Sequence, residues 1–230
     1  MAIQKLTAMT STDMTPLLTI LQEHAVPKYF DSVTLEADGG YISCFCGETE
    51  FLRIYKYIGY KGYPTAEDKA GFLIKTSSGV EQVVAISYGT YYVGSVLVCS
   101  SCIVFMPSTG EQNFALLAKD SNGNTCFYAL TSDAGNNWGN TSGLTSGASE
   151  CKIWAISAAD SKIRSYNGYL NNTDNINGKM LGMPISTYDH TMRDVYFPAV
   201  RQFTEITAPI VAEIDGVQHL VGRGFIALAE

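Results

Sequence analysis

The apolar positions divide the chain into one short helical segment and a long series of strands. Residues 15–25 carry apolar side chains at helical spacing, after a Thr-Pro pair that is typical of a helix start and before Pro27, which ends the run. We therefore expect one helix there, preceded by a polar arm. Two roles stay open for this helix: covering the core, which the pattern favours, or docking on another subunit through Leu17, Leu18 and Leu21.

From residue 31 onward the pattern changes to short apolar runs separated by turn residues. Asn-Gly, Asp-Gly and similar pairs readily take the backbone angles of tight hairpins. They predict hairpins at Asp38-Gly39-Gly40, Ser77-Ser78-Gly79, Asn122-Gly123 and Asp215-Gly216.

Other runs complete the strand series. Residues 51–58 and 151–157 are predicted as strands, and residues 91–106 as two strands with a break near Ser100. Residues 158–169 are interpreted as a short helix or coil. The Gly222-Arg-Gly segment is interpreted as a bulge or a close backbone approach inside the last strand.

This turn frequency, with little helical periodicity, predicts a mainly β protein: an antiparallel β-sandwich or barrel with one short N-terminal helix. Fourteen Tyr, ten Phe and twenty-one Gly suit such a sheet protein with many turns. We expect an N-terminal arm and docking helix over residues 1–30 and a single antiparallel β domain over residues 31–230.

Charge and hydropathy exclude several classes of function. The net charge is −7 and the basic residues are scattered, which argues against a nucleic-acid binder. The longest apolar stretch, residues 93–106, is broken by glycine and serine, so no membrane insertion is expected. Without a targeting signal, the six cysteines are expected to be thiols in a reducing cytoplasm, and oxidation of some of them in a released particle stays open.

Two cysteine pairs offer enough thiols for a zinc site: Cys44 with Cys46, and Cys99 with Cys102. Their spacing lacks the tight knuckle of such sites, and buried structural thiols are the better interpretation. A thioredoxin-like redox role is less favoured, because the Cys-x-x-Cys lies in no βαβ context. We therefore expect no metal and no cofactor.

Catalytic chemistry finds little support. His190 with its neighbours Asp189, Arg193 and Asp194 is the one polar cluster that resembles a site, and a solvated turn explains it better. No catalytic motif is present, so we expect no enzyme. The oxygen-rich segment at residues 120–124 is interpreted as a turn, because it lacks the ligand spacing of a calcium loop.

Residues 132–150 form a long Gly/Ser/Asn-rich segment around one tryptophan. Loops of this length are usually functional or disordered. We interpret it as a projecting loop in which Trp138, Asn137 and Asn140 are candidate contacts for a partner or ligand. A tryptophan folded back on the sheet is the equally open alternative.

Near the C-terminus, an aromatic segment with proline is followed by an apolar strand, an Asp-Gly turn and a short Gly-containing strand. The residues are Tyr196, Phe197, Pro198 and Phe203, then Ile214, Asp215 and Gly216, then Gly224, Phe225, Ile226 and Ala227. This arrangement resembles uncharacterised virion-associated proteins of tailed bacteriophages and prophages of gut-type Gram-positive bacteria. Segments 35–42 and 119–124 also resemble such proteins. The resemblance departs from them at residues 15–25 and 132–150.

The resemblance implies a structural or host-contact role on a particle and carries over no catalytic residue. We expect a non-enzymatic virion protein on the particle exterior, made in the host bacterial cytoplasm and anchored through its N-terminal segment or contacts between copies. Capsid decoration and a tail-fibre or baseplate position both remain open. The expected partners are other copies of the chain and major capsid or tail proteins.

The alternative is a carbohydrate-binding adhesin. In that case Trp138 and Tyr-rich loops would stack on a host surface glycan. A cell-wall hydrolase that uses His190 is the third interpretation.

Overall fold

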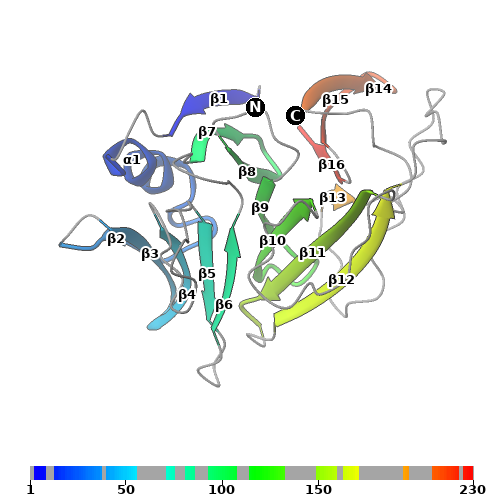
Figure 1. Ribbon diagram of the computed structural model, residues 1–230. Coiled ribbons are helices and arrows are strands. Elements are labelled where there is room, and N and C mark those ends of the chain that lie inside the picture. Colours follow the sequence, from blue (N-terminus) through cyan, green and yellow to red (C-terminus); the bar gives the residue numbers. More distant parts are fainter. Residues whose placement is uncertain are drawn as a thin grey trace.

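The computed structural model describes residues 3–8, 13–37, 40–55, 71–75, 81–85, 93–107, 114–132, 149–159, 163–170, 194–196, 209–222 and 225–229. Within these ranges the chain is mainly β, with antiparallel sheets and one short helix. The predicted fold class is therefore confirmed (Figure 1).

Three antiparallel sheets make up the described fold. The central sheet has seven strands in the order β1 (Gln4–Thr7), β7 (Val93–Val98), β8 (Cys102–Pro107), β9 (Phe114–Lys119), β10 (Thr125–Ser132), β11 (Ser149–Ser157) and β12 (Ile163–Leu170). The N-terminal sheet has five, in the order β2 (Ser32–Leu35), β3 (Tyr41–Cys46), β4 (Thr49–Tyr55), β5 (Gly71–Lys75) and β6 (Glu81–Ala85). The C-terminal sheet has four, in the order β13 (Val195–Tyr196), β16 (Phe225–Leu228), β15 (Val217–Gly222) and β14 (Ile210–Ile214).

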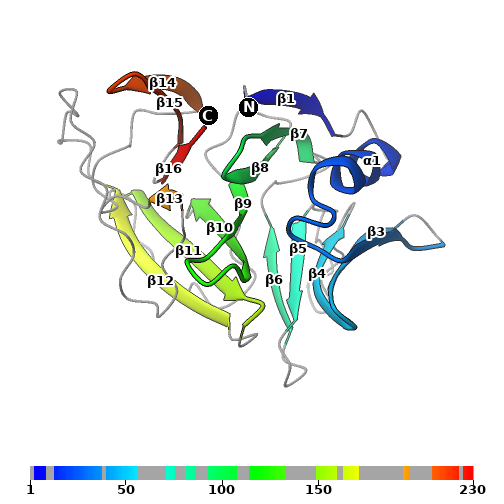
Figure 2. The same cartoon turned by 180° about the vertical axis from the view of Figure 1, so that it is seen from behind.

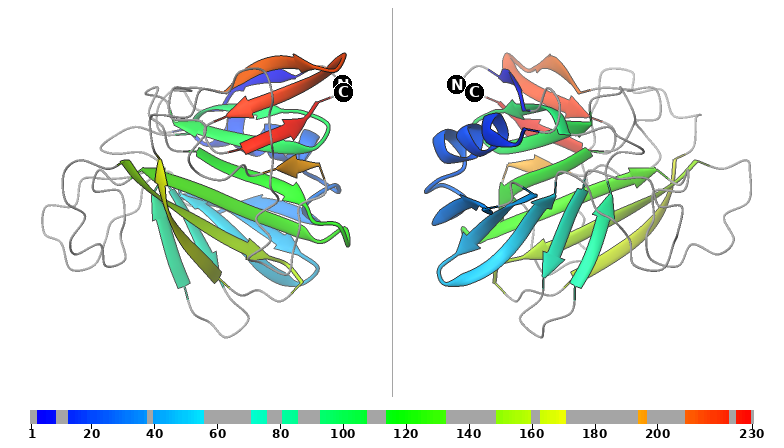
Figure 3. Two further views of the ribbon diagram at one scale, coloured as in Figure 1. Left: turned by 90° about the vertical axis from the view of Figure 1, so that its right-hand side faces the viewer. Right: turned by 60° about the vertical axis from the view of Figure 1, so that its left-hand side comes forward.

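The central sheet is buried on both faces along β8, β9 and β10. Successive side chains of a strand point to opposite faces, so each of these strands contributes to two cores. One core lies against α1 (Thr15–His24) and the N-terminal sheet and includes Ile103, Phe105, Leu117 and Phe127. The other lies against the C-terminal sheet and includes Cys102, Val104, Leu116, Ala118 and Tyr128. The views in Figure 3 show the C-terminal sheet over one part of this central layer.

The N-terminal segment is part of the fold. α1 begins with Pro16 in its first turn, where the missing N–H costs nothing. Leu17 and Leu21 are fully buried, and Leu18 packs against the same core. The favoured role of this helix, covering the core, is confirmed, and these leucines lie against their own chain. β1 pairs with β7, so residues 4–7 are a strand and not the free arm expected from the sequence.

The strongest turn signals form the predicted hairpins. Asp215 and Gly216 take φ angles of 52° and 79° between β14 and β15. Gly123, with φ 84°, lies between β9 and β10. These left-handed angles are the ones that Asp-Gly and Asn-Gly pairs tolerate best. β7 and β8 also separate near Ser100, as expected.

Two further sequence-based assignments were wrong. Residues 163–170, most of which lie in the segment 158–169 interpreted as helix or coil, form β12, and the whole length of β12 pairs with β11. Ile163, Tyr166 and Tyr169 favour a pleated strand, and Gly168 disfavours a helix. The last apolar run is two strands, because β15 turns back into β16 after Gly222.

Gly222 is a site of close approach, as the sequence suggested. A Cβ added there would overlap the ring of Phe225, which is fully buried. Gly222→Ala is therefore expected to destabilise the protein by about 1–3 kcal/mol, because the ring has no free space to enter. Urea denaturation measures this. Gly222→Ala combined with Phe225→Leu should recover part of the loss, and equal stability of wild type and Gly222→Ala would contradict the packing described.

Both chain ends lie side by side at the same end of the molecule (Figure 2). Ile3 packs against the core that the C-terminal sheet shares with the central sheet. The cysteine-containing turn between β7 and β8 lies beside the last strand, because the hydroxyls of Ser100 and Ser101 donate to the carbonyl of Leu228.

Candidate functional site

The turn at residues 99–102, called the cysteine turn from here on, carries two cysteines and two serines in four consecutive positions. The paired positions Val98 and Ile103 bring its ends together, and the N–H of Cys99 donates to the carbonyl of Cys102 at 3.0 Å. The sulfur atoms of Cys99 and Cys102 lie 3.2 Å apart as free thiols. A tight strand reversal therefore holds a dithiol.

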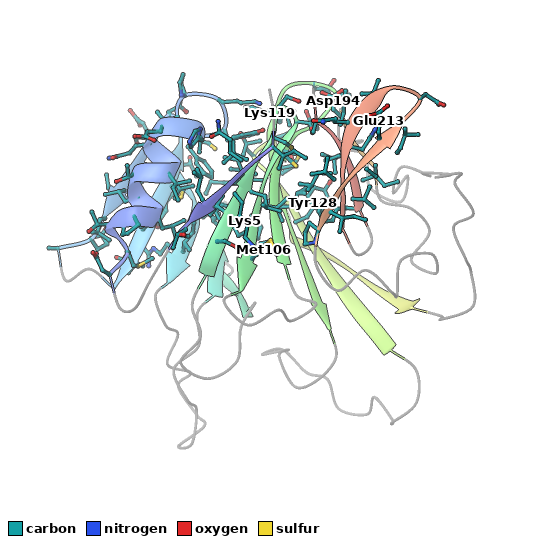
Figure 4. All side chains as sticks on the ribbon, turned by 90° about the horizontal axis from the view of Figure 1, so that it is seen from above. Lys5, Met106, Lys119, Tyr128, Asp194 and Glu213 are labelled. Carbon is teal, nitrogen blue, oxygen red and sulfur yellow. The ribbon has the colours of Figure 1, made fainter. Side chains whose placement is uncertain are left out.

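The C-terminal strand covers this dithiol. Cys102 is fully buried and Cys99 is 3% exposed, and both pack in one cluster with Phe225 and Ala229. Ser100 Oγ donates to the Leu228 carbonyl at 3.3 Å, and Ser101 Oγ donates to the same oxygen. The cluster occupies the space between the central and C-terminal sheets, with Tyr128 of β10 among its side chains (Figure 4).

The two thiols differ in acidity. The pKa of Cys99 is lowered from 9.0 to about 6, mainly because the Cys102 thiol donates a hydrogen bond to the thiolate. Burial opposes this shift, and the backbone N–H of Ser101 adds to it. The pKa of Cys102 is raised well above its usual value, first by burial and then by its bond to Cys99. The pair thus favours one thiolate, on Cys99, beside one thiol, on Cys102.

Lys28 and Tyr29 approach the cysteine turn from the segment after α1. Lys28 Nζ donates to the Ser100 carbonyl, and its charge lowers the pKa of Cys102. The pKa of Tyr29 is raised far above its usual value by burial, and then by the negative charges of Cys102, Cys99 and Asp194. Its hydroxyl is buried without a hydrogen-bond partner in the described part of the chain.

The two cysteine pairs do not form the four-thiol set considered from the sequence. Cys44 and Cys46 belong to the core around α1 and the N-terminal sheet, whereas Cys99 and Cys102 belong to the core under the C-terminal sheet. Burial raises the pKa of Cys44, as it does for an inert structural thiol. No group of three or more metal-ligating side chains gathers within the described ranges.

The reduced protein is expected to gain stability between pH 6 and pH 9. The folded state lowers the pKa of Cys99, so it binds fewer protons than the unfolded state in this window, and stability rises with pH. Above pH 9 the raised pKa of Cys102 and of Tyr29 reverses the sign. The charged neighbours that share this environment are Lys28 and Asp194.

Urea denaturation under reducing conditions at pH 6 and pH 9 measures this effect. Between these two pH values, the free energy of unfolding of Cys99→Ser should rise by at least about 1 kcal/mol less than that of the wild type. This difference is smaller than the free energy that corresponds to a pKa shift of one. Equal pH dependence in wild type and Cys99→Ser would show that the Cys99 thiol is not acidified by folding.

A second candidate surface lies on the C-terminal sheet. β14 is its outermost strand and pairs only with β15 among the described strands. Ile210 and Val211 are 52% and 54% exposed, and Val217 across the hairpin is 38% exposed. We call β14 with Val217 the apolar edge. An exposed, apolar edge strand offers unpaired backbone groups to another chain.

The candidate contact residues in the long loop, Trp138, Asn137 and Asn140, lie outside the described residues, as does His190. The cysteine pair is visible in the sequence, but the residues that cover it are not. The dithiol lies under Leu228 because of a contact across more than a hundred residues of chain, which no local pattern carries.

No family model matches the chain, and no curated protein or solved structure is significantly similar to it. Among the described residues, no helix is both long enough and apolar enough to cross a membrane.

Proposed function

We propose that this chain is a non-enzymatic structural protein of a bacteriophage virion. It would lie on the particle exterior and assemble with copies of itself and with major capsid or tail proteins. The resemblance of its C-terminal segments to virion-associated proteins supports the class of function. The apolar edge is the observation that carries the proposed mode of assembly.

The apolar edge continues the buried face of the C-terminal sheet to a strand where that face is exposed. Leu220 of β15 is buried against the central sheet, and its cross-strand partner Val211 on β14 shares the same sheet face. Val211 is more than half exposed. A further strand laid along β14 would bury Val211 and pair with the backbone edge that carries no neighbour among the described strands.

The exposure of β14, set against the burial of the α1 leucines, supports an anchor on the C-terminal sheet in this proposal. The leucines of α1 pack against the core of their own chain, since Leu17 and Leu21 are fully buried. Ile210 and Val211, by contrast, are exposed on adjacent positions of one strand, so both faces of β14 can contribute to an interface.

Size-exclusion chromatography with light scattering tests assembly through the apolar edge. We expect concentration-dependent self-association of the wild-type protein, weakened at least about tenfold by Val211→Lys, because a charge would then be buried in the interface. Both proteins should have the same stability within about 0.5 kcal/mol, since the position is exposed.

Gln218→Lys is the matched control. Gln218 is also exposed, but it lies on β15, the strand next to the outermost strand β14. It should associate as the wild type does. A wild-type protein that stays monomeric at the highest attainable concentration, or a Val211→Lys protein that associates normally, would reject the apolar edge as the site of assembly.

A further inference from the structure

We propose that Cys99 and Cys102 are a redox site, which closes to a reversible intrachain disulfide by exchange with a small-molecule disulfide of the oxidised-glutathione class. The inference is independent of the proposed function: it concerns the chemistry of the cysteine turn, whatever the protein assembles with. It also goes beyond the sequence-based expectation that these residues are structural thiols.

The geometry favours closure of this pair. The sulfur atoms are 3.2 Å apart, and a disulfide requires about 2.05 Å. Only two residues separate the cysteines, and the bond from the Cys99 N–H to the Cys102 carbonyl already holds the two backbones together. Small side-chain rotations within the turn are therefore enough to form the bond.

Cys99 is the cysteine whose sulfur the described residues bring close to that of Cys102. Cys126 lies in the same core as Cys102, but Ala118 of β9 is paired between them. Two strand spacings separate these positions, about 9.6 Å, which exceeds the Cα separation that a disulfide spans. Cys44 lies in the other core. The structure thus selects Cys99 with Cys102.

The exchange proceeds in two balanced steps. The Cys99 thiolate attacks one sulfur of the oxidant, forms a mixed disulfide and releases one small-molecule thiolate. Cys102 then loses its proton, attacks the Cys99 sulfur and expels the second small-molecule thiolate. The lowered pKa of Cys99 suits it as the first nucleophile. Two cysteine hydrogens are lost and one small disulfide is reduced to two thiols.

Access requires a local opening, because the sulfur atoms lie under the last strand. The hydroxyls of Ser100 and Ser101 hold the Leu228 carbonyl over the turn. Leu228 ends β16, the strand next to β15 in the sheet that also carries the apolar edge. Release of this end exposes the dithiol, and the closed disulfide then fixes the turn on which the C-terminal sheet rests.

Trypsin separates the cysteines into three natural pairs. Cleavage after Lys and Arg places Cys44 with Cys46 in residues 29–53, Cys99 with Cys102 in residues 76–119, and Cys126 with Cys151 in residues 120–152. The full-length protein is equilibrated in buffers of increasing oxidised-to-reduced glutathione ratio. It is then quenched in acid, alkylated with N-ethylmaleimide, digested and measured by mass spectrometry.

Disulfide formation is seen as the loss of two hydrogens with no uptake of label. Peptide 76–119 is expected to reach this state at an oxidised-to-reduced glutathione ratio at least about tenfold lower than the ratio at which the other two peptides reach it. The same experiment in urea should abolish this preference over peptide 29–53, because there the fold no longer sets the sulfur–sulfur distance. Cys99→Ser or Cys102→Ser should abolish closure, and Cys126→Ser should leave it unchanged.

Doubly labelled peptide 76–119 at the most oxidising ratio would overturn the proposal. So would oxidation of all three peptides at the same ratio, or a glutathione adduct on Cys99 that never closes. The wild-type peptide map gives each of these outcomes even if a serine variant fails to fold. None of them bears on self-association through the apolar edge, so the two proposals fail separately.

Discussion

Replacing Phe225 with alanine is expected to destabilise the protein by about 3–5 kcal/mol, the usual cost of removing a buried aromatic ring. Phe225 is fully buried, its ring lies against Gly222, and it belongs to the core between the central and C-terminal sheets. The cavity would lie beside the cysteine turn, among residues of both sheets. Urea or thermal denaturation measures the loss.

Val217→Ala is the matched control for this substitution. Val217 lies in the same C-terminal sheet but is 38% exposed, so its truncation should change stability by no more than about 0.5 kcal/mol. Hydrogen exchange adds a second readout, since Phe225→Ala should deprotect β15 and β16 first. A Phe225→Ala protein with wild-type stability and wild-type exchange would show that the C-terminal sheet does not pack on the central one.

Replacing Asp120 with alanine is expected to cost about 2–4 kcal/mol of stability, because the hydrogen bonds from Asn122 and Asn124 to a buried carboxylate are lost. Asp120 is fully buried at the β9–β10 turn. Its carboxylate accepts the N–H of Asn122 at 2.9 Å, the N–H of Asn124 at 2.8 Å and the side-chain amide of Asn124 at 3.0 Å. Without it, the turn keeps its Gly123 but loses the acceptor that orders it.

Chemical denaturation compares Asp120→Ala with Asn122→Ala. The Asn122 side chain is exposed, and the substitution keeps the backbone N–H that Asp120 binds, so it should change stability by less than about 0.5 kcal/mol. Equal stability of Asp120→Ala and wild type would mean that the carboxylate does not organise this turn. The interpretation of residues 120–124 as a turn depends on these contacts.

The parts of the fold that were predictable are the ones that local chemistry dictates. Asp215 and Gly216 take left-handed backbone angles that few other residues accept, so the dipeptide alone predicts this hairpin. Pro16 and Pro27 bracket the helix for similarly local reasons.

The part that was missed depends on packing over long distances. Residues 163–170 form a strand because β11 supplies a paired neighbour, and their mixed pattern does not reveal this alone. β8, β9 and β10 lack the apolar–polar alternation of a one-sided sheet, which is the signal that both faces are covered. That signal is present in the sequence. The sequence does not show which elements cover the two faces, namely α1 with the N-terminal sheet on one and the C-terminal sheet on the other.

The candidate sites follow the same division. The Cys-x-x-Cys pair was visible in the sequence, and the acidity of Cys99 was not, because it depends on the rotamers of Cys102 and Ser101. The exposure of Val211 was also hidden, since its strand reads like the buried strands beside it. Both features arise from how the C-terminal sheet is placed.

The two proposals meet at that sheet. Its outermost strand offers the apolar edge, and the end of β16 closes over the cysteine turn. Disulfides seldom persist in the reducing cytoplasm, so Cys99 and Cys102 would oxidise after a particle leaves it. The disulfide would then hold the turn that contacts the sheet carrying the apolar edge. This connection rests on both proposals, and each has its own test.

The presence of the chain in purified virions tests the central claim most directly. Quantitative mass spectrometry of density-purified particles of the encoding phage should find it at a constant ratio to the major capsid protein, and antibodies should label intact particles from outside. Its absence from particles that contain the full set of capsid and tail proteins would contradict the structural role proposed here.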